Sequence, residues 1–194
     1  MDALRSLDYS LFFFINGNHN SAFDFLMWWS SDRWIWIPLY VFLAWFLYRN
    51  YPKQAISLLV CAGLMILATD QLSSSVIKQA VHRLRPCHTP QIEAQVHLVN
   101  GYCGGMFGFL SSHAANTFAL VTFLVLLFKQ HHSILKWMLI GWAILVSYSR
   151  IYLGAHFPAD IICGALLGIL LGLLFYRLYK YYSARLLIVL EESS

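Results

Sequence analysis

Charged side chains are scarce in this sequence. Only 11% of its 194 residues are charged, whereas 59% are hydrophobic. A soluble domain carries about a quarter charged residues, so this chain has too little charge to face water on all sides. That shortage excludes a free cytosolic enzyme and a disordered tail. We therefore expect an all-α membrane protein with a single domain over residues 1–194.

Two further absences narrow the class of protein. None of the four cysteines (Cys61, Cys87, Cys103 and Cys163) forms a CxxC pair, which argues against a zinc or redox cluster. The apolar segment from Leu7 to Ile15 is too short to span a bilayer and lacks a small-residue cleavage site, so we interpret it as interfacial rather than as a secretory signal. The net charge of +4 is weak evidence for nucleic-acid binding, and no nucleic-acid partner is expected.

Long apolar runs dominate the rest of the chain. Five of them approach or reach the roughly 20 residues that a membrane helix needs, over residues 34–48, 55–77, 114–128, 134–148 and 158–176. We predict a polytopic bundle of five spanning helices, preceded by interfacial helices over residues 1–32. A sixth crossing over residues 7–30 is the alternative, although several Asn, His and Asp side chains lie in the middle of that segment.

Basic residues mark one side of this predicted bundle. Lys and Arg gather in segments 49–53, 129–136 and 177–185, and such segments tend to face the cytoplasm. The polar residues with catalytic chemistry all lie near the opposite ends of the runs. These residues fall into three separate segments, which the predicted topology brings to the outer face of the membrane.

The first segment is KQAVHRLRP, from Lys78 to Pro86. If the second apolar helix continues past the membrane surface, Lys78 and Arg85 are seven residues apart and face the same side, and Pro86 ends the helix. Two cations on one face predict an anion site. The alternative is a basic helix end that binds lipid headgroups.

The second segment is FLSSHAANT, in which Ser111 and Ser112 precede an apolar helix. One of the two serines is then the N-cap, and the free N–H groups of the first turn form a seat for an anion such as phosphate. His113 in the first turn could donate a proton to a leaving group at neutral pH. The alternative is an ordinary capped helix with an interfacial histidine.

The third segment, SRIYLGAHFPAD, is the most specific. Pro158 suits the first position of a helix, which places Asp160 about 6 Å along the axis from His156. A carboxylate at that distance can orient the imidazole and leave its other nitrogen free as a nucleophile. Arg150 offers several donors to a tetrahedral oxyanion. The alternative is that Asp160 only stabilises the helix N-terminus.

Together the segments read K-x6-R-P, S-x-H and S-R-x3-G-x-H-x3-D over residues 78–160. This order resembles the tripartite signature of the type 2 phosphatidic acid phosphatase (PAP2) family, which vanadium-dependent haloperoxidases share. The middle motif departs from the usual Pro-Ser-Gly-His, because this chain has Leu110-Ser111-Ser112-His113. The serine and the histidine are kept, but the close backbone approach that glycine allows is in doubt.

The resemblance implies a metal-independent phosphatase without a cofactor. His156 would attack phosphorus to form a phosphohistidine, Asp160 would orient it, and His113 would protonate the leaving oxygen. The non-bridging oxygens would be held by Lys78, Arg85, Ser111, Ser112 and Arg150.

The predicted site at the membrane surface favours a lipid phosphate as the substrate, with the bilayer as the second partner, because each buried CH₂ contributes about 0.8 kcal/mol. Undecaprenyl diphosphate, phosphatidylglycerol phosphate, phosphatidic acid and lipid A phosphate all fit. By the resemblance we expect a bacterial inner-membrane location with the site facing the periplasm. A haloperoxidase and a non-catalytic lipid-binding or transport protein are the alternatives, and the oligomeric state is not predicted.

Two features remain outside the motifs. Cys87 and Cys103 lie on the predicted outer side, where a disulfide could close a loop of about 16 residues and contribute about 3 kcal/mol. That bridge would tie the segment 87–110 to Arg85. Asp70 lies within the second apolar run, and the sequence does not identify its partner.

Overall fold

Helices account for nearly all regular structure in the computed structural model, which describes residues 2–128 and 130–192. Within these residues the only extended pairing is an isolated bridge between Leu84 and Phe107. The helices are α1 (Asp2–Asn16), α2 (Ser21–Ser31), α3 (Ile37–Asn50), α4 (Ala55–Gln71), α5 (Lys78–Val81), α6 (Ser112–Phe128), α7 (Ser133–Tyr152) and α8 (Pro158–Glu192).

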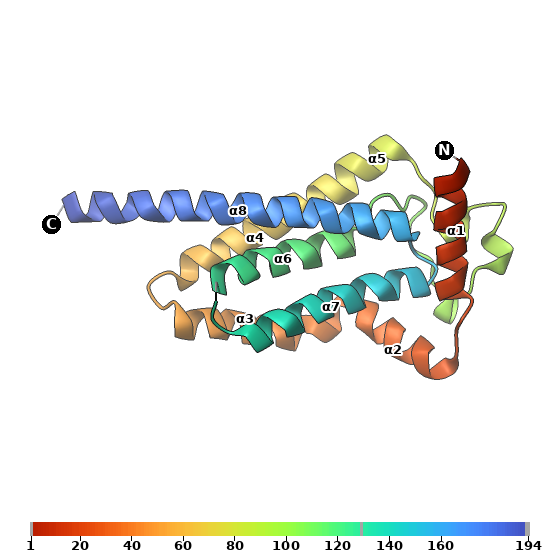
Figure 1. The fold of residues 1–194 in the computed structure, drawn as a ribbon, viewed down its shortest axis with the longest axis horizontal. Helices are drawn as coiled ribbons and strands as arrows, with labels where there is room; N and C mark the ends of the chain where they lie inside the picture. Colours follow the sequence, from red (N-terminus) through yellow and green to blue (C-terminus); the bar gives the residue numbers. More distant parts are fainter. Residues whose placement is uncertain (1, 129, 193–194) are drawn as a thin grey trace.

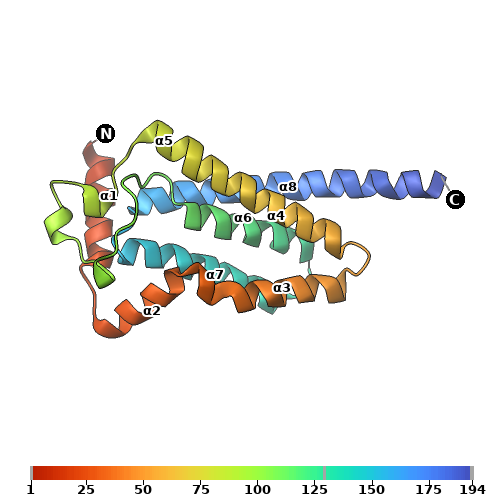
Figure 2. The same cartoon turned by 180° about the vertical axis from the view of Figure 1, so that it is seen from behind.

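The predicted helix bundle is present. Helices α3, α4, α6, α7 and α8 run alongside one another, and α1 lies across one end of them (Figures 1 and 2). The α3–α4 and α6–α7 connections lie at the opposite end, so the basic turns are separated from α1 by the length of the bundle. Residues 7–30 form two helices with a turn at residues 17–20 between them, so a single continuous helix does not cover the segment in which a sixth crossing was the alternative.

Three helical segments are long and apolar enough to cross a membrane: Ala55–Val81, Ser133–Tyr152 and Pro158–Ala184. Helix α6 has 17 residues and α3 has 14, both shorter than the roughly 20 residues of a typical span. The chain is therefore a membrane protein, and the number of five crossings stays a prediction for α3 and α6.

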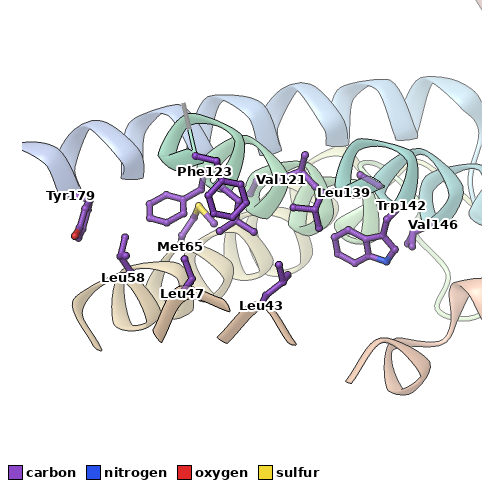
Figure 3. Packing of buried hydrophobic residues seen from close by; sticks show 14 residues of the cluster. Leu43, Leu47, Leu58, Met65, Val121, Phe123, Leu139, Trp142, Val146 and Tyr179 are labelled. Carbon is purple, nitrogen blue, oxygen red and sulfur yellow. The ribbon is translucent and has the colours of Figure 1, made fainter. Parts of the chain in front are cut away.

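The central core forms where all five long helices meet. Figure 3 shows side chains from α3, α4, α6, α7 and α8 pointing into it, with Phe123 and Met65 fully buried near its middle. A second cluster joins Phe12 of α1 to Phe157 and Ile161. Through this second cluster α1 is fixed over the end of the bundle that contains the predicted catalytic segments.

Small residues allow α6 and α8 to pack backbone to backbone. Gly164, Gly168 and Gly172 lie on one face of α8, and a Cβ added at any of them would meet a carbonyl oxygen of the α6 segment at 2.3–2.7 Å. Glycine at every fourth position is a common way for membrane helices to approach closely. This contact sets the spacing between the N-termini of α6 and α8, where two of the predicted motifs begin.

Replacement of Gly168 with alanine should destabilise this contact. The new Cβ would lie 2.3 Å from the carbonyl oxygen of Ala115, and overpacking of this kind costs about 1–3 kcal/mol. We expect a lower thermal unfolding midpoint for Gly168→Ala in detergent, measured by circular dichroism.

The matched control is Gly141→Ala in α7, because nothing lies within 4 Å of a Cβ there. Both substitutions remove one glycine from a helix interior, so their effects on the unfolded chain are the same. Equal midpoints for the two variants would contradict the proposed α6–α8 contact.

Candidate active site

The three predicted segments meet at the end of the bundle beneath α1. The backbone N–H of Ser111, before α6, donates to the carbonyl oxygen of Asp160 in α8 at 3.1 Å. The Arg85 guanidinium donates to the carbonyl oxygen of Ala155 at 3.1 Å, and the His156 N–H donates to that of Arg150 at 3.2 Å. The first two contacts join the third motif to the second and to the first, and the last contact lies within the third motif.

His156 lies in the centre of this arrangement and is only 1% exposed. Its Nε2 atom is 3.4 Å from an Arg85 Nη1 atom, and its Nδ1 atom is 3.6 Å from Oδ2 of Asp160. The second distance is too long for a hydrogen bond. Oδ2 instead accepts the Phe157 N–H at 3.0 Å. The expected hydrogen bond between carboxylate and imidazole is therefore absent, although the two groups are adjacent.

Asp160 is held mainly by Arg83, a residue that the sequence analysis did not single out. Arg83 donates to Oδ1 of Asp160 at 2.7 Å and also pairs with Asp8 of α1. Asp8 in turn accepts the Ala159 N–H at 2.8 Å, in the first turn of α8. The sequence offered one indication of a role for Arg83, which is that Arg83 lies two residues before Arg85. Its partner Asp8 could not be identified in the same way, because Asp8 lies 75 residues away in the chain.

The path from Lys78 to Arg85 differs from the predicted continuous helix. The helix ends at Val81, and His82 adopts a left-handed conformation with φ 52°. The chain then runs extended, and the Arg85 N–H donates to the Met106 carbonyl oxygen at 3.0 Å. The prediction that Lys78 and Arg85 share a helix face is therefore wrong. The backbone hydrogen bond to Met106 holds the extended segment so that the Arg85 side chain points into the site.

Lys78 reaches the second motif through a widened helical turn. Residues Leu72–Ile77 form a π-helical segment between α4 and α5, a feature that often marks functional sites. After it, the Lys78 ammonium donates to the Ser112 hydroxyl at 3.2 Å, and the Ser73 hydroxyl donates to the same oxygen at 2.9 Å. The Ser112 hydroxyl thus links the first two motifs.

Ser111 is the residue that precedes α6, and its hydroxyl accepts the Ala114 N–H at 3.4 Å. Ser111 is fully buried, whereas His113 is half-buried in the first turn. His113 and Arg150 line a cavity of about 530 Å³ that Trp28 and Tyr102 border. His113 also lines a smaller cavity of about 180 Å³ that reaches Asp70.

Three cations surround this region without a direct ion-pair partner in the described chain. Within the described residues, no carboxylate lies at ion-pair distance from Lys78, Arg85 or Arg150. Arg150 donates to the Ser31 hydroxyl, but the buried Nε atoms of Arg85 and Arg150 have no hydrogen-bond partner in the described chain. Buried charges are normally paired, so this arrangement is suited to an anion with several oxygens.

The same environment keeps His156 neutral. Burial first, and then the positive charges of Arg85, Arg150 and Lys78, hold the pKa of His156 well below its ordinary value. A neutral imidazole has a free lone pair on one ring nitrogen. The site therefore combines a neutral imidazole with several hydrogen-bond donors, an arrangement that is chemically suited to attack on an oxyanion.

The structure also places the two features outside the motifs, the pair Cys87 and Cys103 and the side chain of Asp70. Cys87 and Cys103 form a disulfide with Cα atoms 6.1 Å apart, beside Arg85. Asn116 of α6 donates to Oδ1 of Asp70 at 3.2 Å. Neither of the two His/Cys/Asp groups that could share a metal ion in the described chain includes His113, His156 or Asp160.

Comparisons with known proteins show the family to which this chain belongs. The PAP2 superfamily model matches residues 57–184. The lipid A 4'-phosphatase of Bacteroides thetaiotaomicron is 38% identical over 96% of this chain and 83% of that protein. The lipid A 4'-phosphatase of Porphyromonas gingivalis is 34% identical over 95% of this chain and 78% of that protein.

Among solved structures, Aquifex aeolicus LpxE has the same fold. Its TM-score is 0.65, with 24% identity over 88% of this chain and 95% of that chain. The family match covers more than half of the sequence and includes all three motifs. This chain therefore belongs to the PAP2 superfamily of membrane phosphatases.

Proposed function

We propose that this chain hydrolyses a phosphate monoester of a membrane lipid, with the 4'-phosphate of lipid A as the preferred substrate. The carrying observation is that Lys78, Arg85 and Arg150 lie around a buried neutral His156 with no carboxylate at ion-pair distance in the described chain. The names of the two relatives that match nearly the whole chain support lipid A as the substrate. Both relatives are named as phosphatases that act on a lipid.

In the first chemical step His156 is the nucleophile. Its Nε2 atom faces the Arg85 guanidinium, whereas Nδ1 faces Asp160. An incoming phosphoryl group takes the place of the Nε2–Arg85 contact, the N–P bond forms, and the P–O bond to the lipid breaks. The negative charge of the bound phosphate opposes the nearby cations and favours the protonated form of His113, which then gives its proton to the leaving oxygen. The cations and the N–H groups in the first turn of α6 stabilise the charge on the three phosphoryl oxygens.

In the second step water hydrolyses the phosphohistidine. His113, now neutral, removes a proton from the water, whose oxygen attacks phosphorus, and the N–P bond breaks to release phosphate and regenerate His156. Asp160 stabilises the positive imidazole in each transition state. Arg83 and Asp8 position this carboxylate, so they act through Asp160 and not on the substrate.

An apolar cavity next to the site supports a substrate with hydrocarbon chains. It has a volume of about 510 Å³ and lies between α3, α4, α6 and α7. Tyr40, Asn116, Thr117 and Trp142 line both this cavity and the smaller one beside His113. A lipid tail in the apolar cavity would therefore place its headgroup near His113. The basic connections at the other end of the bundle support a periplasmic location for this site.

Replacement of the nucleophile should abolish turnover. We expect His156→Ala to lower kcat for phosphate release from lipid A by about a thousandfold or more, in the presence of EDTA. The control is His131→Ala, an exposed histidine in the α6–α7 connection at the other end of the bundle. Phosphate release by His156→Ala at more than a tenth of the wild-type rate would contradict the phosphohistidine route.

The low pKa of His156 predicts a specific pH profile. Because this pKa is below its ordinary value of 6.5, the nucleophile stays neutral, and kcat/KM should not fall through protonation of His156 until the pH is well below 6.5. Loss of a nearby cation in Lys78→Met should raise this pKa and move the acidic limb of the profile to higher pH. An acidic limb that does not move, or moves to lower pH, would contradict this electrostatic coupling.

The substrate is tested with a panel of pure lipids. We expect hexa-acylated lipid A with phosphates at both the 1 and 4' positions to lose a single phosphate, and mass spectrometry of the product to place the loss at the 4' position. Undecaprenyl diphosphate, phosphatidylglycerol phosphate and phosphatidic acid serve as competitors at equal concentration. Faster release from any of these three would support a lipid phosphatase and contradict the lipid A assignment.

A further inference from the structure

A second cluster of chemically active side chains lies outside the phosphate site. His19 is in the turn between α1 and α2, Asp24 is in the first turn of α2, and His97 is in the connection before α6. The Nε2 atom of His97 is 3.0 Å from Oδ1 of Asp24. The imidazole rings of His19 and His97 stack with centroids 3.6 Å apart. One potential ligand atom from each of the three residues lies within 4.8 Å of the other two.

Two members of the cluster are rigidly positioned. The fully buried Asn16 accepts the His97 N–H at 2.9 Å and donates to the carbonyl oxygens of His97 and Tyr152, at 2.9 and 2.7 Å. The Tyr152 hydroxyl donates to Oδ1 of Asp24 at 2.7 Å. Outer contacts of this kind orient the ligands of metal sites and raise their affinity. They leave Oδ2 of Asp24 available for a further contact.

The third member has room to adjust. His19 is exposed on the turn at residues 17–20, whereas the side chains of Asp24 and His97 are each 23% exposed. Tetrahedral zinc holds its ligand atoms roughly 3.3 Å from one another. The ligand atoms of His19, Asp24 and His97, which lie within 4.8 Å of one another, therefore have to move closer together when zinc binds. Because His19 is exposed, its ring is free to leave the stack when a metal ion binds.

Charge also favours a cation here. The ordinary pKa of an aspartate side chain lies about three units below neutral pH. Asp24 is thus a carboxylate at neutral pH, next to two imidazoles. Two imidazole nitrogens and one carboxylate oxygen form a ligand set typical of zinc sites, with water in the fourth position.

We propose that His19, Asp24 and His97 bind a divalent zinc ion on the outer end of the bundle. The ion fastens the α1–α2 turn to the connection over residues 82–111, which contains Arg83 and Arg85 at one end and the disulfide partner Cys103 near the other. It is separate from the phosphate site, because none of its ligands contacts His113, His156 or Asp160 in the described structure. Its role is therefore structural.

The full-length protein, purified in detergent and stripped with EDTA, is titrated with zinc chloride by calorimetry. We expect one equivalent to bind to wild type, and Co²⁺ in its place to give the visible absorption of a tetrahedral site. His19→Ala should weaken zinc binding at least tenfold. The control His131→Ala removes another exposed histidine and should bind zinc as wild type does.

A second variant tests the buried part of the site. His97→Gln keeps a polar side chain beside Asp24 and should also weaken binding at least tenfold. If this variant does not fold, as judged by its circular dichroism spectrum, His19→Ala alone decides, because its side chain is exposed. Equal zinc affinity of wild type and His19→Ala, or an equal loss in His131→Ala, would overturn the proposal and show only non-specific binding by surface histidines.

Discussion

The concentration of positive charge around one buried imidazole is the constraint on which the rest of this structure depends. Lys78, Arg85 and Arg150 lie near His156 and have no carboxylate at ion-pair distance in the described chain. Desolvated cations that repel one another are costly, so the surrounding fold must hold them in place. In the proposed mechanism a phosphate group supplies the missing negative charge, and burial together with the same cations keeps His156 neutral until the phosphate arrives.

Helix packing provides the necessary rigidity. The glycines of α8 allow its backbone to contact that of α6, which fixes the serines before α6 relative to His156 and Asp160. The π-helical segment Leu72–Ile77 and the extended pairing of Arg85 with Met106 then bring in the two cations of the first motif. Helix α1 completes the end of the bundle, because Asp8 holds both Arg83 and the first turn of α8.

Features that depend on interactions within one helical turn could be predicted from the sequence, whereas contacts between residues far apart in the chain could not. Ser111 before α6 and Asp160 in the first turn of α8 were predictable, because capping and helix dipoles act within one turn. Arg83 was not, because its role depends on Asp8, 75 residues away. The partner of Asp70 was missed for the same reason, since Asn116 lies on another helix. The shared helix face of Lys78 and Arg85 failed because the chain leaves the helix at His82.

Composition and periodicity alone determined that this chain is a helical membrane protein, because so few charges cannot cover a water-exposed surface. The order of the motifs was enough to identify the family and to predict which residues form the phosphate site. Only the tertiary structure decided which atoms face one another: that Nε2 of His156 faces Arg85, and that Asp160 bonds to Arg83 and a backbone N–H instead of the imidazole. Such distances depend on how separate helices pack, and packing over many residues is not encoded in any single motif.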